Sequence, residues 1–215
     1  MKTSGLRRGS GMAGAMARGA ALALACTVLA TALPASAQFR GGYGFIKAVE
    51  DRDGDKVTEM LKDPDVRLIN TRHPDSGESA LAIVVKRRDL NWGKFLLGKG
   101  ADPKIADRQD VTPLMHAAML GFVEAADEML KKGAPVDQAN RRGETALILA
   151  VQRKDAAMVR LLVRSGANPD KSDHITGLSA RDYARRDDRS GQMLTLLEAK
   201  PDAPIKPMGE VFGPK

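Results

Sequence analysis

The chain has 215 residues, of which 43% are hydrophobic, 28% charged and 4% aromatic, and its formal net charge is +7. Four basic residues and no acidic residue precede position 38, so the rest of the chain carries only +3. A charge this small does not indicate nucleic-acid binding. The single cysteine, Cys26, excludes an intrachain disulfide, so an apolar core has to hold the fold together.

Residues 1–37 have the pattern of a secretory signal peptide. Uncharged, mostly apolar residues fill positions 19–33, small residues follow at 34–37, and basic residues precede the run: Lys2, Arg7, Arg8 and Arg18. A positive start, a short apolar stretch and an A-x-A ending are typical of a segment that signal peptidase removes. We therefore expect cleavage near Ala37 and a location in the periplasm or outside the cell.

Three other interpretations of this segment agree less well with its residues. An uncleaved anchor needs about 20 apolar residues to cross a bilayer, which is longer than the run at 19–33. Twin-arginine export through Arg7-Arg8 would need apolar residues soon after the pair. A lipoprotein attached through Cys26 would need leucine in place of Ala23. We predict no transmembrane segment in the cleaved chain.

The remaining chain repeats itself with a step of 33 residues. The step relates the hydroxyl residues Ser79, Thr112 and Thr145, and it relates the dipeptides Gly100-Ala101, Gly133-Ala134 and Gly166-Ala167. A period of this length is typical of stacked-repeat proteins, in which each unit contacts only its neighbours. The period favours binding along an extended surface over chemistry in a cleft.

The clearest unit predicts two helices. Thr112 can cap free amides, and Pro113 suits the first turn of a helix that begins there. Gly121 allows a left-handed backbone that ends this helix. A second helix follows over 123–130 and ends at Gly133. In the neighbouring units Arg88 and Lys154 replace the central glycine, so we expect a less favourable turn there.

The same unit carries the residues of a known repeat. It reads T-P-L-M-H-A-A over 112–118 and closes with Met129-Leu130 and Gly133-Ala134. This resembles the ankyrin repeat, whose unit carries T-P-L-H-x-A-A and a closing L-L-x-x-G-A. One departure is that Met115 occupies the usual histidine position and His116 follows it.

The resemblance implies an all-α solenoid of about five helix-turn-helix units with short hairpin-like loops. The expected domain covers 38–199, with units at about 43–66, 74–103, 107–136, 140–169 and 174–199. The outer two units break the strict step, as terminal repeats do because each presents one face to water. Trp92 is expected in the core, and the Pro-rich tail at 200–215 is expected to be disordered.

No pattern typical of a catalytic, cofactor or metal site is present. His73, His116 and His174 are 43 and 58 residues apart and fall in different units. The acidic stretch 51–55 resembles a calcium loop only superficially, because Lys62 stands where the closing glutamate belongs. We predict that the protein is not an enzyme and needs no cofactor or metal.

Ankyrin proteins bind partners through their loop tips and the exposed face of each first helix. Carried over by position, that surface comprises basic, polar and apolar residues: Lys86, Arg87, Arg108, Gln109, Val111, Met119, Leu120, Arg141, Arg142, Glu144, Gln152 and Arg153. Three apolar side chains within a basic rim predict a partner protein with an acidic, partly apolar surface. We expect the protein itself to be a monomer.

The resemblance and the signal together predict a protein-binding module of the bacterial cell envelope that regulates or scaffolds its partner. Two alternatives remain open. The protein could be an inhibitor or immunity protein of an envelope enzyme or toxin, or it could bind an anionic envelope polymer through its basic residues.

Overall fold

The computed structural model describes residues 35–62, 68–187 and 191–198. Within these residues every regular element is helical, which confirms the all-α prediction. The elements are α1 (Ala35–Glu50), α2 (Gly54–Met60), the short 3-10 helix η1 (Leu68–Asn70), α3 (Ala80–Lys86), α4 (Leu90–Gly98), α5 (Pro113–Leu120), α6 (Val123–Lys131), α7 (Ala146–Gln152), α8 (Ala156–Arg164), α9 (Ala180–Asp187) and α10 (Gln192–Glu198).

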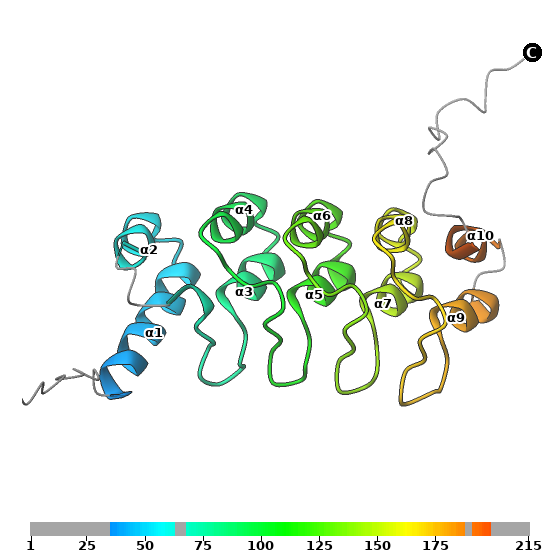
Figure 1. Cartoon of the computed structure of the whole chain (residues 1–215), viewed down its shortest axis with the longest axis horizontal. Coiled ribbons are helices and arrows are strands. Elements are labelled where there is room, and N and C mark those ends of the chain that lie inside the picture. Colours follow the sequence, from blue (N-terminus) through cyan, green and yellow to red (C-terminus); the bar gives the residue numbers. More distant parts are fainter. Residues whose placement is uncertain (1–34, 63–67, 188–190, 199–215) are drawn as a thin grey trace, which may run out of the picture. The chain divides into compact units, whose positions relative to one another are not determined.

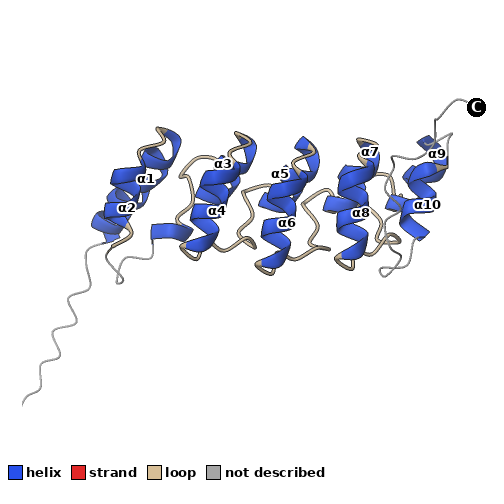
Figure 2. Cartoon of the chain, turned by 90° about the horizontal axis from the view of Figure 1, so that it is seen from above, coloured by secondary structure: helices blue, strands red, loops and turns tan. Residues whose placement is uncertain are grey.

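The helices form two layers that run in chain order (Figures 1 and 2). The first helix of each pair packs on the first helix of the next, so that α1, α3, α5, α7 and α9 make one layer. The second helices α4, α6, α8 and α10 make the other layer in the same way. Each pair therefore contacts only its neighbours, as expected for a stacked repeat.

The predicted hydroxyl caps are confirmed at the start of three first helices. The side-chain oxygen of Thr112 accepts a hydrogen bond from the amide of Met115 at 3.2 Å. Ser79 and Thr145 cap α3 and α7 by the same contact. Several second helices use aspartate instead, which also suits the positive end of the helix: Asp53, Asp89 and Asp155.

The turn between the two helices of a pair is left-handed whether or not it holds glycine. Gly121 has φ of 64°, and the turn residues of the adjacent pairs, Arg88 and Lys154, have φ of 58° and 57°. Arg52 adopts 60° at the matching place between α1 and α2. A side chain in this conformation costs about 1–2 kcal/mol, so the tight turn is kept at some expense of stability.

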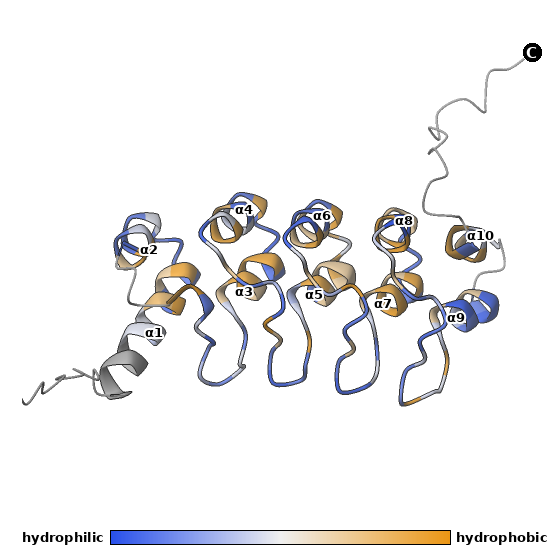
Figure 3. Ribbon diagram, viewed as in Figure 1, coloured by the Kyte–Doolittle hydropathy of each residue, from blue (hydrophilic) through white to orange (hydrophobic). Residues whose placement is uncertain are grey.

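The core lies between the two layers and along the contacts between neighbouring pairs. Leu81, Leu114 and Leu147, which follow the 33-residue step, are all buried. Figure 3 shows the apolar residues concentrated on the helices, whereas the long loops are mostly hydrophilic. Among the described residues, no helix is both long enough and apolar enough to cross a membrane.

Trp92 differs from its expected place in the core. It is only half-buried, and its ring meets Phe95 edge to face with centroids 5.8 Å apart. Together with Arg52 and Asp55 these rings line an open surface pocket. The ring packs against the core on one side, and on the other it lines the surface between α2 and α4.

The predicted signal peptide and the tail at 200–215 lie almost wholly outside the described residues. The exception is Ala35–Ala37, which forms the start of α1. Helix α1 thus begins before the expected first unit at 43 and includes the expected cleavage position.

Candidate functional site

The tips of the long loops are joined by a ladder of backbone hydrogen bonds. The amide of Arg141 donates to the carbonyl oxygen of Gln109 at 3.1 Å. The same bond occurs one step earlier and one step later along the chain, from Arg108 to Ser76 at 3.2 Å and from His174 to Arg142 at 2.8 Å. We call residues 75–76, 108–109, 141–142 and 174–175 the loop-tip surface. Because main-chain atoms make the ladder, the tips keep a fixed spacing.

A side-chain acceptor inside each loop fixes its shape. Asp107, Asn140 and Asp173 each accept a hydrogen bond from the amide two residues later, at 2.7, 2.9 and 2.9 Å. Local bonds of this kind are the reason that aspartate and asparagine are frequent in turns. In the loop 73–78 the imidazole of His73 takes this place and accepts from the amides of Asp75 and Ser76.

Most residues of the predicted partner surface are exposed. They are Lys86, Arg108, Gln109, Arg141, Arg142, Gln152 and Arg153. Some of their charges are paired within the protein. Lys86 Nζ lies 2.6 Å from Glu78 Oε1, and Arg141 Nε lies 3.4 Å from Asp110 Oδ2. The Arg141–Asp110 pair is exposed on both sides, and such pairs contribute about 0–1 kcal/mol, so a partner can replace it at little cost.

The apolar centre of the predicted surface is less accessible than expected. Val111, Met119 and Leu120 are half-buried and packed against the core. The expectation that Met119 and Leu120 point outward needs correction, because α5 is flanked by α3 on one side and α7 on the other. These neighbours cover much of its surface.

Arg87, which the repeat register places on the partner surface, is mostly buried and holds two helix pairs together. Its side chain is 17% exposed. Its Nη1 donates to the carbonyl oxygen of Val49, near the end of α1, at 2.6 Å. The guanidinium lies over the ring of Trp92, 5.6 Å from the centroid. The charge of Arg87 is therefore used between neighbouring pairs and is not presented to solvent.

Glu144 also differs from its predicted place. The repeat register places it at a loop tip, but it is only 8% exposed. Its Oε2 accepts a hydrogen bond from Asn140 Nδ2 at 2.9 Å, which draws the carboxylate back against its own loop. Glu144 therefore stabilises the loop that presents Arg141 and Arg142.

Ile175 is an exposed apolar residue that the sequence reasoning missed. Its exposed fraction is 68%, the higher of the two large apolar side chains that are exposed among the described residues. It stands one step of 33 after Arg142, at the tip of the next loop. Extending the repeat register to that loop would have found it. Amides of Ile175 and Thr176 both donate to Asp173, so the tip is well ordered.

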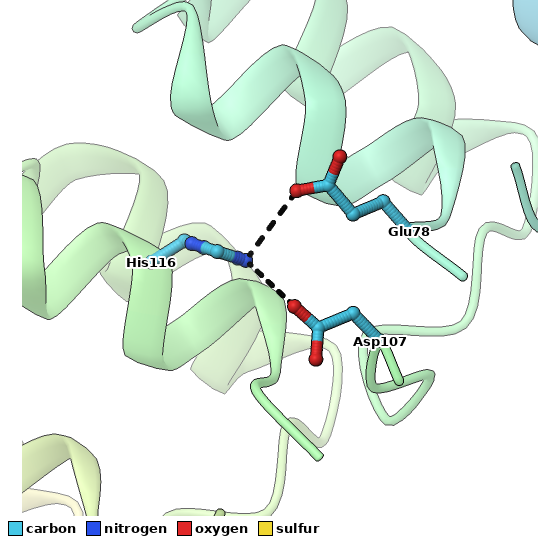
Figure 4. Close-up of side chains that lie close together, drawn as sticks. All are labelled: Glu78, Asp107 and His116. Atoms are coloured by element: carbon cyan, nitrogen blue, oxygen red, sulfur yellow. Dashed lines mark ion pairs between the residues drawn. The ribbon is translucent and has the colours of Figure 1, made fainter. Parts of the chain in front are cut away.

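A second group of polar side chains meets where two of the loops approach α5 (Figure 4). His116 of α5 points at two carboxylates from the loops before α3 and α5. Its Nε2 lies 3.7 Å from Asp107 Oδ2 and 4.0 Å from Glu78 Oε1. His116 is 9% exposed, and its Nε2 has no hydrogen-bond partner. The two carboxylates come from two different units, so the spacing of the histidines along the sequence does not reveal them.

Burial and neighbouring charges set the protonation of His116 and Glu78. Burial lowers the pKa of His116 below its ordinary value, although Asp107 and Glu78 act in the opposite direction. Burial raises the pKa of Glu78, but the ammonium of Lys86, the hydroxyl of Ser76 and His116 together outweigh it, so the pKa of that carboxyl lies below its usual value. At neutral pH the group combines a neutral imidazole with an ionised glutamate.

Comparisons with known proteins agree with this architecture. The family model described as "Ankyrin repeats (3 copies)" matches residues 45–138 and 81–173, which together span more than half of the chain. A protein of Treponema pallidum named as ankyrin repeat-containing is 36% identical over 142 residues, covering 66% of this chain and 46% of its own length. Inversin of Gallus gallus is 34% identical over 124 residues, covering 55% of this chain and 11% of its own. The chain thus spans less than half the length of these relatives.

Proposed function

Because the chain belongs to the ankyrin-repeat family, which mediates protein–protein interaction, we propose that it is a non-enzymatic binding module of the bacterial cell envelope. It docks a partner protein on the loop-tip surface and thereby regulates or scaffolds that partner. The observation that carries this proposal is the ladder of loop tips. It joins four neighbouring tips into one rigid surface, and pre-ordered surfaces lose little entropy on binding.

The side chains on this surface indicate the chemistry of the partner. Arg108, Arg141 and Arg142 are exposed, and the exposed Ile175 lies at the next tip. An apolar anchor beside arginines is typical of the residues that carry binding energy at interfaces. The partner is therefore a protein with an acidic surface that also offers an apolar contact. Ile175 takes the anchoring place that Met119 and Leu120 were expected to fill.

A paired substitution tests this surface. Arg142→Ala with Ile175→Glu removes a basic side chain and the anchor from the tips. The matched control, Lys132→Ala with Tyr43→Glu, makes the same changes at exposed places elsewhere. Affinity capture from an envelope extract should return a partner with the wild type and the control but not with the paired variant.

The unfolding midpoint reports whether the paired variant acts through binding. Exposed substitutions of this kind change stability by less than about 0.5 kcal/mol, so all three proteins should unfold alike. Continued capture of the same partner by the folded variant would contradict the proposed surface. If the captured partner is an enzyme and the wild-type protein inhibits it, the protein is an inhibitor or immunity protein of that enzyme.

The envelope location rests on the signal-like pattern of residues 1–37. Fractionation of the producing cell should recover the protein outside the cytoplasm. Its intact mass should correspond to a chain that begins near Gln38. A full-length chain confined to the cytoplasm would contradict export.

A second candidate function, binding of an anionic envelope polymer, is favoured by the row of arginines alone. Polymer binding through charge should fall steeply between low and physiological salt, because salt screens exposed charges. Docking of a partner protein that depends on the apolar contact of Ile175 should be less sensitive to salt. Steep salt dependence without an effect of Ile175→Glu would favour the polymer.

A further inference from the structure

We propose that Glu78, Asp107 and His116 bind one divalent transition-metal ion of the Zn²⁺ class, at the junction of two helix pairs. Within the part of the chain that the structure describes, one ligand atom from each of these residues lies within 4.8 Å of the other two. One imidazole and two carboxylates make a three-residue donor set of the kind that zinc accepts, with one position open. This proposal is independent of the proposed partner surface.

The distances suit a metal better than direct hydrogen bonds. Nε2 of His116 lies 3.7 and 4.0 Å from the two carboxylate oxygens, which is too far for a hydrogen bond. Ligand atoms that surround zinc tetrahedrally at about 2.0–2.1 Å lie about 3.4 Å apart. Small side-chain rotations therefore bring the three atoms onto one ion.

The unpartnered nitrogen is the second observation that points to a ligand. Nε2 of His116 is buried and makes no hydrogen bond. Leaving a buried polar group without a partner destabilises the fold, and such groups are rare in folded proteins. A metal ion held between His116 and the two carboxylates would satisfy this nitrogen.

Surrounding contacts aim both carboxylates at the imidazole. Asp107 Oδ1 accepts the amides of Gln109 and Val111, at 2.7 and 2.9 Å, which leaves Oδ2 facing His116. Glu78 Oε2 accepts from the hydroxyl of Ser76 at 3.2 Å, which leaves Oε1 facing the same point. Contacts of this kind orient the residues that ligate metals in proteins.

The protonation of the group also suits a metal, which needs deprotonated ligands. His116 is neutral at neutral pH because burial lowers its pKa, and Glu78 is ionised. The imidazole donor favours Zn²⁺ and its neighbours over Mg²⁺ and Ca²⁺, which prefer oxygen ligands alone.

Lys86 competes for the same carboxylate. Its Nζ lies 2.6 Å from Glu78 Oε1, so the ammonium holds the oxygen that the metal needs. The side chain of Lys86 is 48% exposed, and it can swing into solvent. Removing this positive charge should therefore strengthen metal binding, whereas removing a ligand should weaken it. General attraction of cations to acidic residues would show the same two signs, but it would neither saturate at one Zn²⁺ per chain nor prefer Zn²⁺ to Mg²⁺ and Ca²⁺.

The experiment measures Zn²⁺ bound to the full chain without an affinity tag. Cys26→Ser serves as the background, because a thiol would bind zinc itself. Equilibrium dialysis should give one Zn²⁺ per chain, and bound Co²⁺ should show the visible absorption of a low-symmetry site. Mg²⁺ and Ca²⁺ at the same concentration should not displace Zn²⁺.

Asp107→Asn is the decisive variant. Asn140 occupies the matching place one step later and makes the same loop bond, so the asparagine preserves the fold while removing a charged ligand. Zinc affinity should fall by more than about tenfold. Glu78→Gln provides an independent check with the same expectation. His174→Gln, which removes an exposed histidine from another loop, should leave the affinity unchanged.

Lys86→Met should raise the affinity several-fold. The proposal is overturned if the wild type binds no stoichiometric zinc, or if Asp107→Asn and Glu78→Gln bind zinc as the wild type does. It is also overturned if His174→Gln loses as much affinity as those variants, or if Lys86→Met weakens binding.

Discussion

Arg87 and Arg88 are adjacent in the sequence, but their side chains bond to different helix pairs, one before and one after their own. Arg87 donates back to the carbonyl oxygen of Val49, near the end of α1. Arg88 donates forward to the carbonyl oxygen of Leu120, at the end of α5, also at 2.6 Å. Both acceptors are carbonyl groups in the last turn of a helix, where intrahelical hydrogen bonds run out. The pair Arg87–Arg88 therefore ties three successive helix pairs together.

This role predicts that Arg87→Ala destabilises the fold. The change removes the bond to Val49 and the contact with Trp92, so the free energy of unfolding should fall by about 1–3 kcal/mol. Urea denaturation of the wild type and the variant measures the difference.

Arg141→Ala is the matched control, because its side chain is 61% exposed. Its effect should stay within about 0.5 kcal/mol. Equal stability of Arg87→Ala and the control would mean that Arg87 belongs to the solvent-exposed surface after all.

At the scale of one element, the loop 173–178 is organised around a single carboxylate. Asp173 is buried, and its Oδ2 accepts hydrogen bonds from the hydroxyls of Tyr183 and Thr176 at 2.7 and 2.8 Å. Burial raises the pKa of Asp173, but the bonds from Tyr183, Thr176 and the amide of Ile175 outweigh it and lower the pKa to about 2. The loop that presents Ile175 is thus held by an ionised side chain.

The low pKa of Asp173 predicts a pH-dependent contribution to stability. The carboxyl has a pKa of about 3.9 in an unfolded chain and about 2 in the folded protein. The ionised form therefore stabilises the folded state by about 2 kcal/mol above the unfolded pKa, and this is lost as pH falls through the folded pKa. Asp173→Asn should be less stable than wild type at pH 7, and the difference should vanish as the pH falls below about 2.

Urea unfolding across this pH range measures the difference between the two proteins. Asp75→Asn, at an exposed position in another loop, is the control and should follow the wild type at every pH. A constant difference between wild type and Asp173→Asn would show that the charge of Asp173 does not contribute.

The elements could be predicted from the sequence to a greater extent than the sites. The caps at Thr112 and Thr145 and the turn at Gly121 depend on local backbone chemistry, and these local signals identify the residues directly. Whether a loop side chain is exposed depends on the neighbouring unit instead. Glu144 turns inward to Asn140, and no local pattern indicates this. The meeting of His116 with two carboxylates likewise depends on how loops from two units stack.

At the scale of the whole stack, stability is a property of neighbouring pairs. Helix α5 packs on α3 and α7, whereas α10 packs on α8 and α9 at the end of the described stack. In such linear arrangements the ends can open without the centre, because each interface is local. The same core substitution should therefore have different consequences at the two places.

Leu114→Ala and Leu197→Ala compare the centre with the end. Both leucines are buried, in α5 and α10 respectively. Each substitution should cost about 2–5 kcal/mol locally. Hydrogen exchange followed by mass spectrometry should show faster exchange from α3 to α8 in Leu114→Ala, but only in α9 and α10 in Leu197→Ala. Uniform acceleration in both variants would indicate that the stack unfolds as one unit.

The loop ladder has a consequence for how such a surface can change. Its hydrogen bonds use main-chain atoms only, so they do not depend on which side chains stand at Gln109, Arg142 and Ile175. The side chains at these three positions can therefore be substituted one by one, without changing the spacing of the loop tips. Randomising them together would give a library of binders with one common backbone, and new specificities could be selected from it without redesign of the scaffold.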